Sequence, residues 1–154
     1  MSSFEINIIN DDEFPILSEN ELLECLEIVA TNQNLAQANV NINIVSNSDI
    51  QEVNSQYRQK DKPTNIISFP FEKPEGLPED IMNEFLGDIL IAPDVLKKEA
   101  IEQNKPLENH WKHIFIHGLL HLCGYDHIID AEAEEMENLE IQLLEKLNIA
   151  NPYL

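Results

Sequence analysis

The chain is poor in cysteine and has no long apolar segment. Its longest apolar run is far shorter than the ~20 residues that a membrane-spanning helix needs, and its first residues show no basic region followed by an apolar stretch. We therefore expect a cytoplasmic protein without a signal peptide or a membrane segment. Cys25 and Cys123 match no zinc-binding or redox spacing, so we expect two reduced thiols and no disulfide.

Basic side chains are also scarce. Lysine and arginine together number 9 against 29 acidic residues, and the formal net charge is −20. This charge argues against a protein that binds nucleic acid over most of its surface. The only arginine is Arg58, and Lys60 and Lys62 lie close behind it. The three cations are consistent with a local phosphate-binding groove, although a solvated loop accounts for the spacing equally well.

The length and the apolar content of 43% predict one globular domain over residues 1–154. A capping box formed by Ser18 and Glu21 marks the start of the first helix, and Asp130 is expected to cap the last one. The acidic, proline-containing stretch 70–78 is expected to be loop. Apolar periodicity predicts strands at 4–8, 40–44, 65–69 and 85–91, and helices at 19–32, 50–57, 93–103, 106–124 and 130–147.

The segment 85–91 is apolar on both of its faces, which is typical of a central strand covered from both sides. Asp88 interrupts it, and a carboxylate in such a strand is costly unless it is paired or hydrogen-bonded. The predicted fold class is α+β, with about four strands in a mixed sheet and about five helices. The order of the strands does not follow from the sequence.

Histidines are concentrated in residues 110–127, and three of them follow a metal-binding pattern. His117 and His121 are four residues apart on a predicted helix, so their imidazoles can bind one ion. Gly124 can end this helix in a left-handed conformation, after which the chain can turn back and supply His127 as a third ligand. Three nitrogen ligands with a free fourth position are typical of a catalytic zinc. We therefore expect a zinc site at the end of the histidine helix.

The same histidine spacing occurs in metzincin proteases, in which glutamate directly follows the first histidine and acts as the general base. In this chain the corresponding residue is Gly118, so a peptidase would lack its base. A metallopeptidase-like hydrolase is therefore kept only as an alternative hypothesis.

The run from His117 to His127 resembles the signature His-Gly-x-Leu-His-Leu-x-Gly-Tyr-Asp-His of the YbeY family of bacterial metal-dependent endoribonucleases. Three further blocks are similar to those of the family and occur in the same order, namely 54–70, 86–89 and 132–137. Two positions in these motifs depart mildly from the family pattern. Asn65, in the block 54–70, replaces a commoner aspartate, and Cys123, in the run 117–127, fills a variable position.

This resemblance implies a single-strand-specific, zinc-dependent endoribonuclease. The implied roles are ribosomal RNA processing, with late maturation of the 16S rRNA 3′ end, and quality control of 70S ribosomes. One zinc ion per chain, with nickel as another candidate, would be bound by His117, His121 and His127. The resemblance also implies a functional Arg58, and we expect Arg58 and His117 to take part in catalysis.

Ribosomal RNA is the expected substrate, and no DNA or membrane partner is expected. Because the negative net charge weakens non-specific attraction to phosphate, we also expect a ribosomal or GTPase protein partner that helps to deliver the RNA. A non-catalytic, zinc-stabilised, ribosome-associated module is a further alternative hypothesis.

Several nearby residues each have a functional and a structural interpretation. Lys60 and Lys62 are candidates for holding neighbouring phosphates. Asp88 and Asp126 are candidates either for orienting a ligand histidine or for an ordinary structural hydrogen bond. His113 is a candidate for contact with substrate, although a packed neutral histidine is the favoured interpretation.

Overall fold

Alternating apolar residues form a four-stranded sheet in the computed structural model, which describes residues 3–71 and 85–153. The strand order is β1-β2-β4-β3. The β1–β2 and β2–β4 pairs are parallel and β3 runs antiparallel to β4, so the sheet is mixed, as predicted. Residues 72–78 of the predicted loop lie outside the described residues. The strands are β1 (Phe4–Ile9), β2 (Ala38–Ile44), β3 (Ile66–Pro70) and β4 (Phe85–Ile91).

The strand β4 lies between β2 and β3 and is covered on both faces, as its sequence predicts. Ile89 and Ile91 are fully buried in the main core on one face. Leu90 packs on the other face in a smaller cluster around Ile50 of α2 (Asn47–Arg58). Asp88 is half-buried and accepts a 3.0 Å hydrogen bond from Asn41 Nδ2, which offsets part of the cost of its burial.

One strand ends later than expected. The third strand was expected at 65–69 with a loop from residue 70, but Pro70 is the last residue of β3. The backbone N–H of Phe71 donates to the carbonyl oxygen of Leu86 in β4, and in an antiparallel ladder these bonds fall on alternate residues. A backbone N–H at residue 70 would therefore point away from β4, so the sheet loses no hydrogen bond to proline there. Proline is tolerated at such a position of an edge strand.

Capping residues determine where the helices begin. Ser18 Oγ accepts a 3.2 Å hydrogen bond from the backbone of Glu21 at the start of α1, as predicted. Ser46 caps α2, which therefore starts earlier than its apolar spacing indicates. The prediction for Asp130 was wrong, because Ile129 is the N-cap residue and Asp130 is the first helical residue. The negative charge of Asp130 still interacts favourably with the helix dipole at this position. The other helices are α1 (Glu19–Asn32), α3 (Pro93–Glu102), α4 (Leu107–Leu122) and α5 (Asp130–Glu145).

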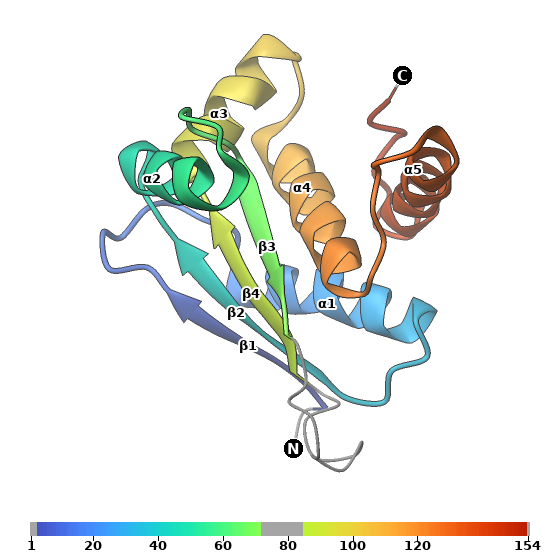
Figure 1. Cartoon of the computed structure of the whole chain (residues 1–154). Coiled ribbons are helices and arrows are strands. Elements are labelled where there is room, and N and C mark those ends of the chain that lie inside the picture. Colours follow the sequence, from blue (N-terminus) through green and yellow to red (C-terminus); the bar gives the residue numbers. More distant parts are fainter. Residues whose placement is uncertain (1–2, 72–84, 154) are drawn as a thin grey trace.

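The histidine helix α4 is the centre of the helical layer (Figure 1). It packs against β3 and against α1, α3 and α5, and α5 lies on the side of α4 away from the sheet. Trp111, Phe115 and Leu119 of α4 are buried in the main core between this layer and the sheet. The opposite face of α4 is therefore left to carry the histidines.

The two cysteines are unpaired, as expected. Burial raises the pKa of the Cys25 thiol to about 12 and that of Cys123 to about 11, so both are protonated at neutral pH. Across residues 3–71 and 85–153, no helix combines the length and the apolar character that crossing a bilayer requires.

Candidate metal centre and its cleft

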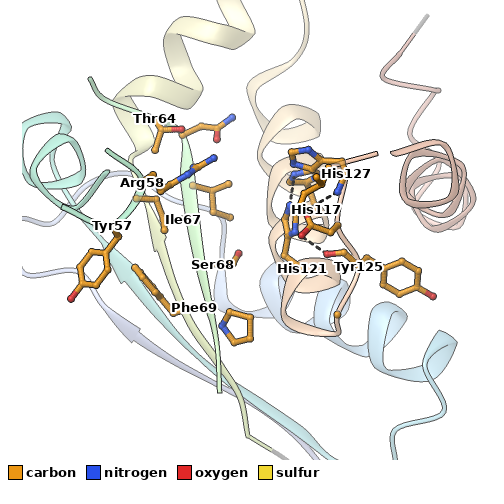
Figure 2. A pocket seen from close by; sticks show the side chains of 16 residues that line it. Tyr57, Arg58, Thr64, Ile67, Ser68, Phe69, His117, His121, Tyr125 and His127 are labelled. Carbon is orange, nitrogen blue, oxygen red and sulfur yellow. Dashed lines mark hydrogen bonds between the residues drawn. The ribbon is translucent and has the colours of Figure 1, made fainter. Parts of the chain in front are cut away.

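The three predicted ligand histidines converge at the end of α4 (Figure 2). One ligand atom from each of His117, His121 and His127 can be chosen so that all three lie within 4.8 Å of one another. The Nε2 atoms of His117 and His121 are 3.1 Å apart. Ligands of a tetrahedral zinc with bonds of about 2.0–2.1 Å are separated by about 3.4 Å. The geometry and the all-nitrogen donor set therefore fit a zinc ion.

A sharp turn after α4 brings the third histidine to the other two. Gly124 follows the helix with φ +103°, and its N–H donates to the carbonyl oxygen of His121 at 3.0 Å. Among the described residues other than the two chain neighbours of Gly124, no heavy atom lies within 4 Å of the position that a Cβ on Gly124 would occupy. The backbone conformation, and not crowding, therefore requires glycine. The structure thus confirms the predicted helix end, and Asp126 Oδ1 then accepts the backbone N–H of His127 at 2.8 Å.

In His117 and His121, the ring nitrogen that faces away from the convergence point has a partner. Nδ1 of His121 lies 3.0 Å from the carbonyl oxygen of Tyr125, and Nδ1 of His117 lies 3.2 Å from Oε2 of Glu140. Burial lowers the pKa of His121, and the nearby His117 lowers it further. This shift favours the neutral imidazole, which is the form that binds metal ions.

Two of the candidate orienting residues have structural hydrogen bonds instead. Asp88 binds Asn41 in the sheet, and Asp126 binds the backbone of His127 in the turn. His113 is buried, with its Nε2 2.7 Å from Oε1 of Glu140, which agrees with the packed interpretation.

The residue that sequence reasoning missed is Glu140, whose exposed fraction is 0%. Burial raises the pKa of its carboxyl group, but hydrogen bonds with His113 and His117 outweigh burial and bring the pKa to about 2. A signal was available in the sequence. Position 140 lies four residues after Met136 and three before Leu143, and thus within the apolar stripe of α5.

The histidines form part of one wall of a cleft of about 850 Å³. The end of α4 and the following turn form this wall, and β3 with the end of α2 forms the other. Arg58, the last residue of α2, lines the cleft and extends from the wall opposite the histidines (Figure 2). The structure therefore brings the predicted arginine and the predicted ligands to one cavity. Lys60 and Lys62 are exposed and are not among its lining residues.

The turn after α2 is fixed by a buried amide. Asn54 Nδ2 donates a 2.9 Å hydrogen bond to the carbonyl oxygen of Lys62, and the carbonyl oxygen of Asn54 accepts the N–H of Lys60. These bonds fix the backbone of the turn that follows the end of α2 at Arg58.

Asn65, the departure from the family pattern, also lines the cleft. Its Nδ2 donates to Oε1 of Glu99 at 3.1 Å, and His110 Nε2 contacts the same oxygen at 3.0 Å. An aspartate at position 65 would place a second carboxylate against Glu99, so the amide suits this neighbour.

Comparisons with known proteins agree with the geometry. The family model described as "Endoribonuclease YbeY" matches residues 6–148. A protein of that name from Francisella philomiragia subsp. philomiragia is 67% identical over 154 residues, which is 100% of this chain and 98% of the relative. Its namesake from Francisella tularensis subsp. novicida is 66% identical, over 100% of this chain and 95% of the relative. A solution structure from Thermotoga maritima is 28% identical, covers 93% of this chain and 91% of its own, and has a TM-score of 0.58.

Proposed function

Because the chain belongs to the YbeY endoribonuclease family, we propose that it is a single-strand-specific, zinc-dependent endoribonuclease that acts on ribosomal RNA in the cytoplasm. One observation carries the proposal: three convergent imidazoles and the only arginine of the chain line the same cleft. A metal site with a free position, facing a guanidinium across a cavity, is suited to hydrolysis of a phosphodiester.

The proposed roles divide between the two walls of the cleft. His117, His121 and His127 would hold the ion, which when bound supplies a Lewis acid and lowers the pKa of a coordinated water to about 7. Arg58 would bind the phosphoryl oxygens through its planar fork of N–H donors and stabilise the charge that develops on them. His117 contributes to catalysis as one of the residues that position the ion.

The rim of the cleft supports a single-stranded substrate. Tyr57 is 69% exposed at one side and Ile128 is 80% exposed at the other, and both line the cleft. The Tyr57 ring is supported edge-on by Phe69, with the ring centroids 5.4 Å apart. Unpaired bases can stack on such apolar surfaces, whereas bases within a duplex cannot reach them.

The proposed substrate is the precursor of the 16S rRNA 3′ end, with defective 70S ribosomes as a second target. A net charge of −20 disfavours unassisted binding to RNA, which supports delivery by a ribosomal or GTPase partner. Equal cleavage of naked RNA and of ribosomes would count against such a partner.

Position 118 argues against the peptidase alternative. A Cβ on Gly118 would lie 2.5 Å from Cδ1 of Ile66, so this position points into the contact between α4 and β3. The site where metzincins carry their glutamate therefore leaves no room for a general base.

The test is incubation of the zinc-loaded protein with a single-stranded 16S 3′ precursor, the same segment as a duplex, and casein. We expect cleavage of the single strand alone, and end-group analysis of its fragments identifies the chemistry of the reaction. Cleavage of casein with the RNA intact would support the peptidase hypothesis. Zinc binding with all three substrates intact would support the non-catalytic module.

A further inference from the structure

We propose that Glu140 is a positioning residue that holds His117 in the tautomer needed for metal binding, and that Tyr153 at the C-terminal end of the described chain helps to hold Glu140. The inference rests on the proposed function only in that it assumes a metal ion at the three histidines. It concerns the metal centre itself and needs no RNA.

The burial of Glu140 is unusual for a charged residue. Its exposed fraction is 0%, and its neighbours Met136, Leu143 and Leu144 along α5 are equally buried. A carboxylate in such a place is strongly destabilising unless its oxygens accept hydrogen bonds. The structure supplies these bonds from α4 and from the C-terminal residues.

Both oxygens of Glu140 are engaged. Oε1 is 2.7 Å from His113 Nε2 and 2.9 Å from Tyr153 Oη, and Oε2 is 3.2 Å from His117 Nδ1. An ionised carboxylate can only accept hydrogen bonds. With Glu140 as a carboxylate, Tyr153 Oη and the two ring nitrogens donate to it, an arrangement that puts a proton on Nε2 of His113 and on Nδ1 of His117.

This assignment determines which atom of His117 is free for an ion. With its proton on Nδ1, the neutral ring has its lone pair on Nε2, the atom that lies 3.1 Å from Nε2 of His121. His121 reaches the same state in a different way, because the backbone carbonyl of Tyr125 in the adjacent turn accepts from its Nδ1. One ligand is thus oriented locally and the other by a helix distant in sequence.

The C-terminal residues are fixed beside this carboxylate. Lys105 Nζ donates to the carbonyl oxygen of Pro152 at 2.6 Å, and the N–H of Tyr153 donates to Asn151 Oδ1 at 2.8 Å. The ring of Tyr153 packs edge-on against His113, with centroids 5.4 Å apart. The hydroxyl of Tyr153 consequently reaches a carboxylate that contacts a metal ligand. The packing of the C-terminal residues against α4 is therefore coupled to the affinity for the metal ion.

The test compares three variants of the full chain for zinc affinity, by competition with a chromogenic chelator. Glu140→Gln keeps the shape of the side chain, but its amide N–H₂ must face one of the three donors. We expect a loss of affinity of roughly 10- to 100-fold for this variant, the range typical of partners that orient metal ligands. Tyr153→Phe should weaken zinc binding less, and the matched control Glu134→Gln, exposed on the same helix, should bind as the wild type does.

A second readout follows the proton itself. In ¹H–¹⁵N spectra of the zinc-loaded wild type, His117 should show a slowly exchanging Nδ1–H, and this signal should exchange faster in Glu140→Gln. Ligation of zinc through Nδ1 of His117 would overturn the proposal even if Glu140→Gln fails to fold. Unchanged affinity in a folded Glu140→Gln would also overturn it while leaving the proposed function intact. A wild type that binds no zinc would overturn both.

Discussion

Ser68 of β3 donates a 3.1 Å hydrogen bond from its Oγ to the carbonyl oxygen of Gly118 in the middle of α4. The helix can lie this close to the edge strand because residue 118 has no side chain. The contact places His117 and His121 beside β3, and the cleft forms between the end of α4 and that strand. The approach of α4 to β3 is therefore a condition for the candidate site.

The contact predicts that a side chain at position 118 lowers the stability of the fold, by an amount that depends on the side chain at position 66. A Cβ there would lie 2.5 Å from Ile66 Cδ1 and 3.1 Å from Ser68 Oγ. Overpacking costs about 1–3 kcal/mol and the gain in helix propensity returns about 1 kcal/mol, so we expect Gly118→Ala to be the less stable protein in urea unfolding. Ile66→Val removes Cδ1, so in that background the cost of Gly118→Ala should fall. A Gly118→Ala protein more stable than the wild type would contradict this packing.

Arg58 predicts a separation of activity from metal content. Arg58→Ala should lower kcat/KM for single-stranded RNA by roughly 100- to 1000-fold, the usual effect of removing a group that stabilises developing charge. Zinc content, measured by atomic absorption, should not change, because Arg58 lies on the wall opposite the histidines. Lys62→Ala is the control, since Lys62 does not line the cleft. Full cleavage by Arg58→Ala would remove this residue from the mechanism.

Zinc should stabilise the folded protein through the three histidines. At a free zinc concentration of about 100 times Kd, binding adds about 2.7 kcal/mol to the free energy of unfolding. We expect the melting temperature of the wild type to rise on addition of zinc and that of His121→Ala to stay constant. Magnesium, which prefers oxygen ligands, serves as the control ion for the wild type. An equal rise for His121→Ala would place zinc elsewhere on the protein.

Glu99 predicts a dependence of stability on pH. Burial raises the pKa of this carboxyl group, but hydrogen bonds with His110 and Asn65 outweigh burial and bring the pKa below its usual 4.5. A pKa lower in the folded state means that Glu99 stabilises the fold above about pH 4.5, and that this stabilisation is lost as the pH falls through the lowered value.

The measurement is urea unfolding of wild type and Glu99→Gln at neutral and at acidic pH. The variant should be less stable by about 1 kcal/mol at neutral pH, and the difference should shrink in acid. Glu102→Gln, exposed on the same helix, should show little difference at either pH. A difference that does not depend on pH would contradict the role assigned to the carboxylate.

Local patterns were sufficient to predict most elements and the ligand trio. The apolar residues on both faces of β4 identified a central strand, because burial on both faces requires apolar residues at consecutive positions. The convergence of His117, His121 and His127 was also predictable, because one helical turn and one glycine determine it. These features depend on residues that are close together in the sequence.

Features that depend on distant contacts were not predicted. The strand order places β4 beside both β2 and β3, and periodicity within a strand contains no information about its neighbours. Glu140 was missed because its three donors come from α4 and from the C-terminal residues. Asp88 and Asp126 were considered because they are close to the histidines in sequence or on a buried strand. In the structure Asp88 accepts from the Asn41 side chain, and Asp126 accepts from the backbone of His127.

All three ligand histidines lie within residues 117–127, whereas Glu140 and Tyr153 come later in the chain. A ribosome that makes the chain from its N-terminus therefore releases the imidazoles before the carboxylate that aligns one of them. A newly made chain can therefore bind its ion before residues 140 and 153 have reached their places, and the proposed alignment of His117 follows when Glu140 and Tyr153 dock against α4.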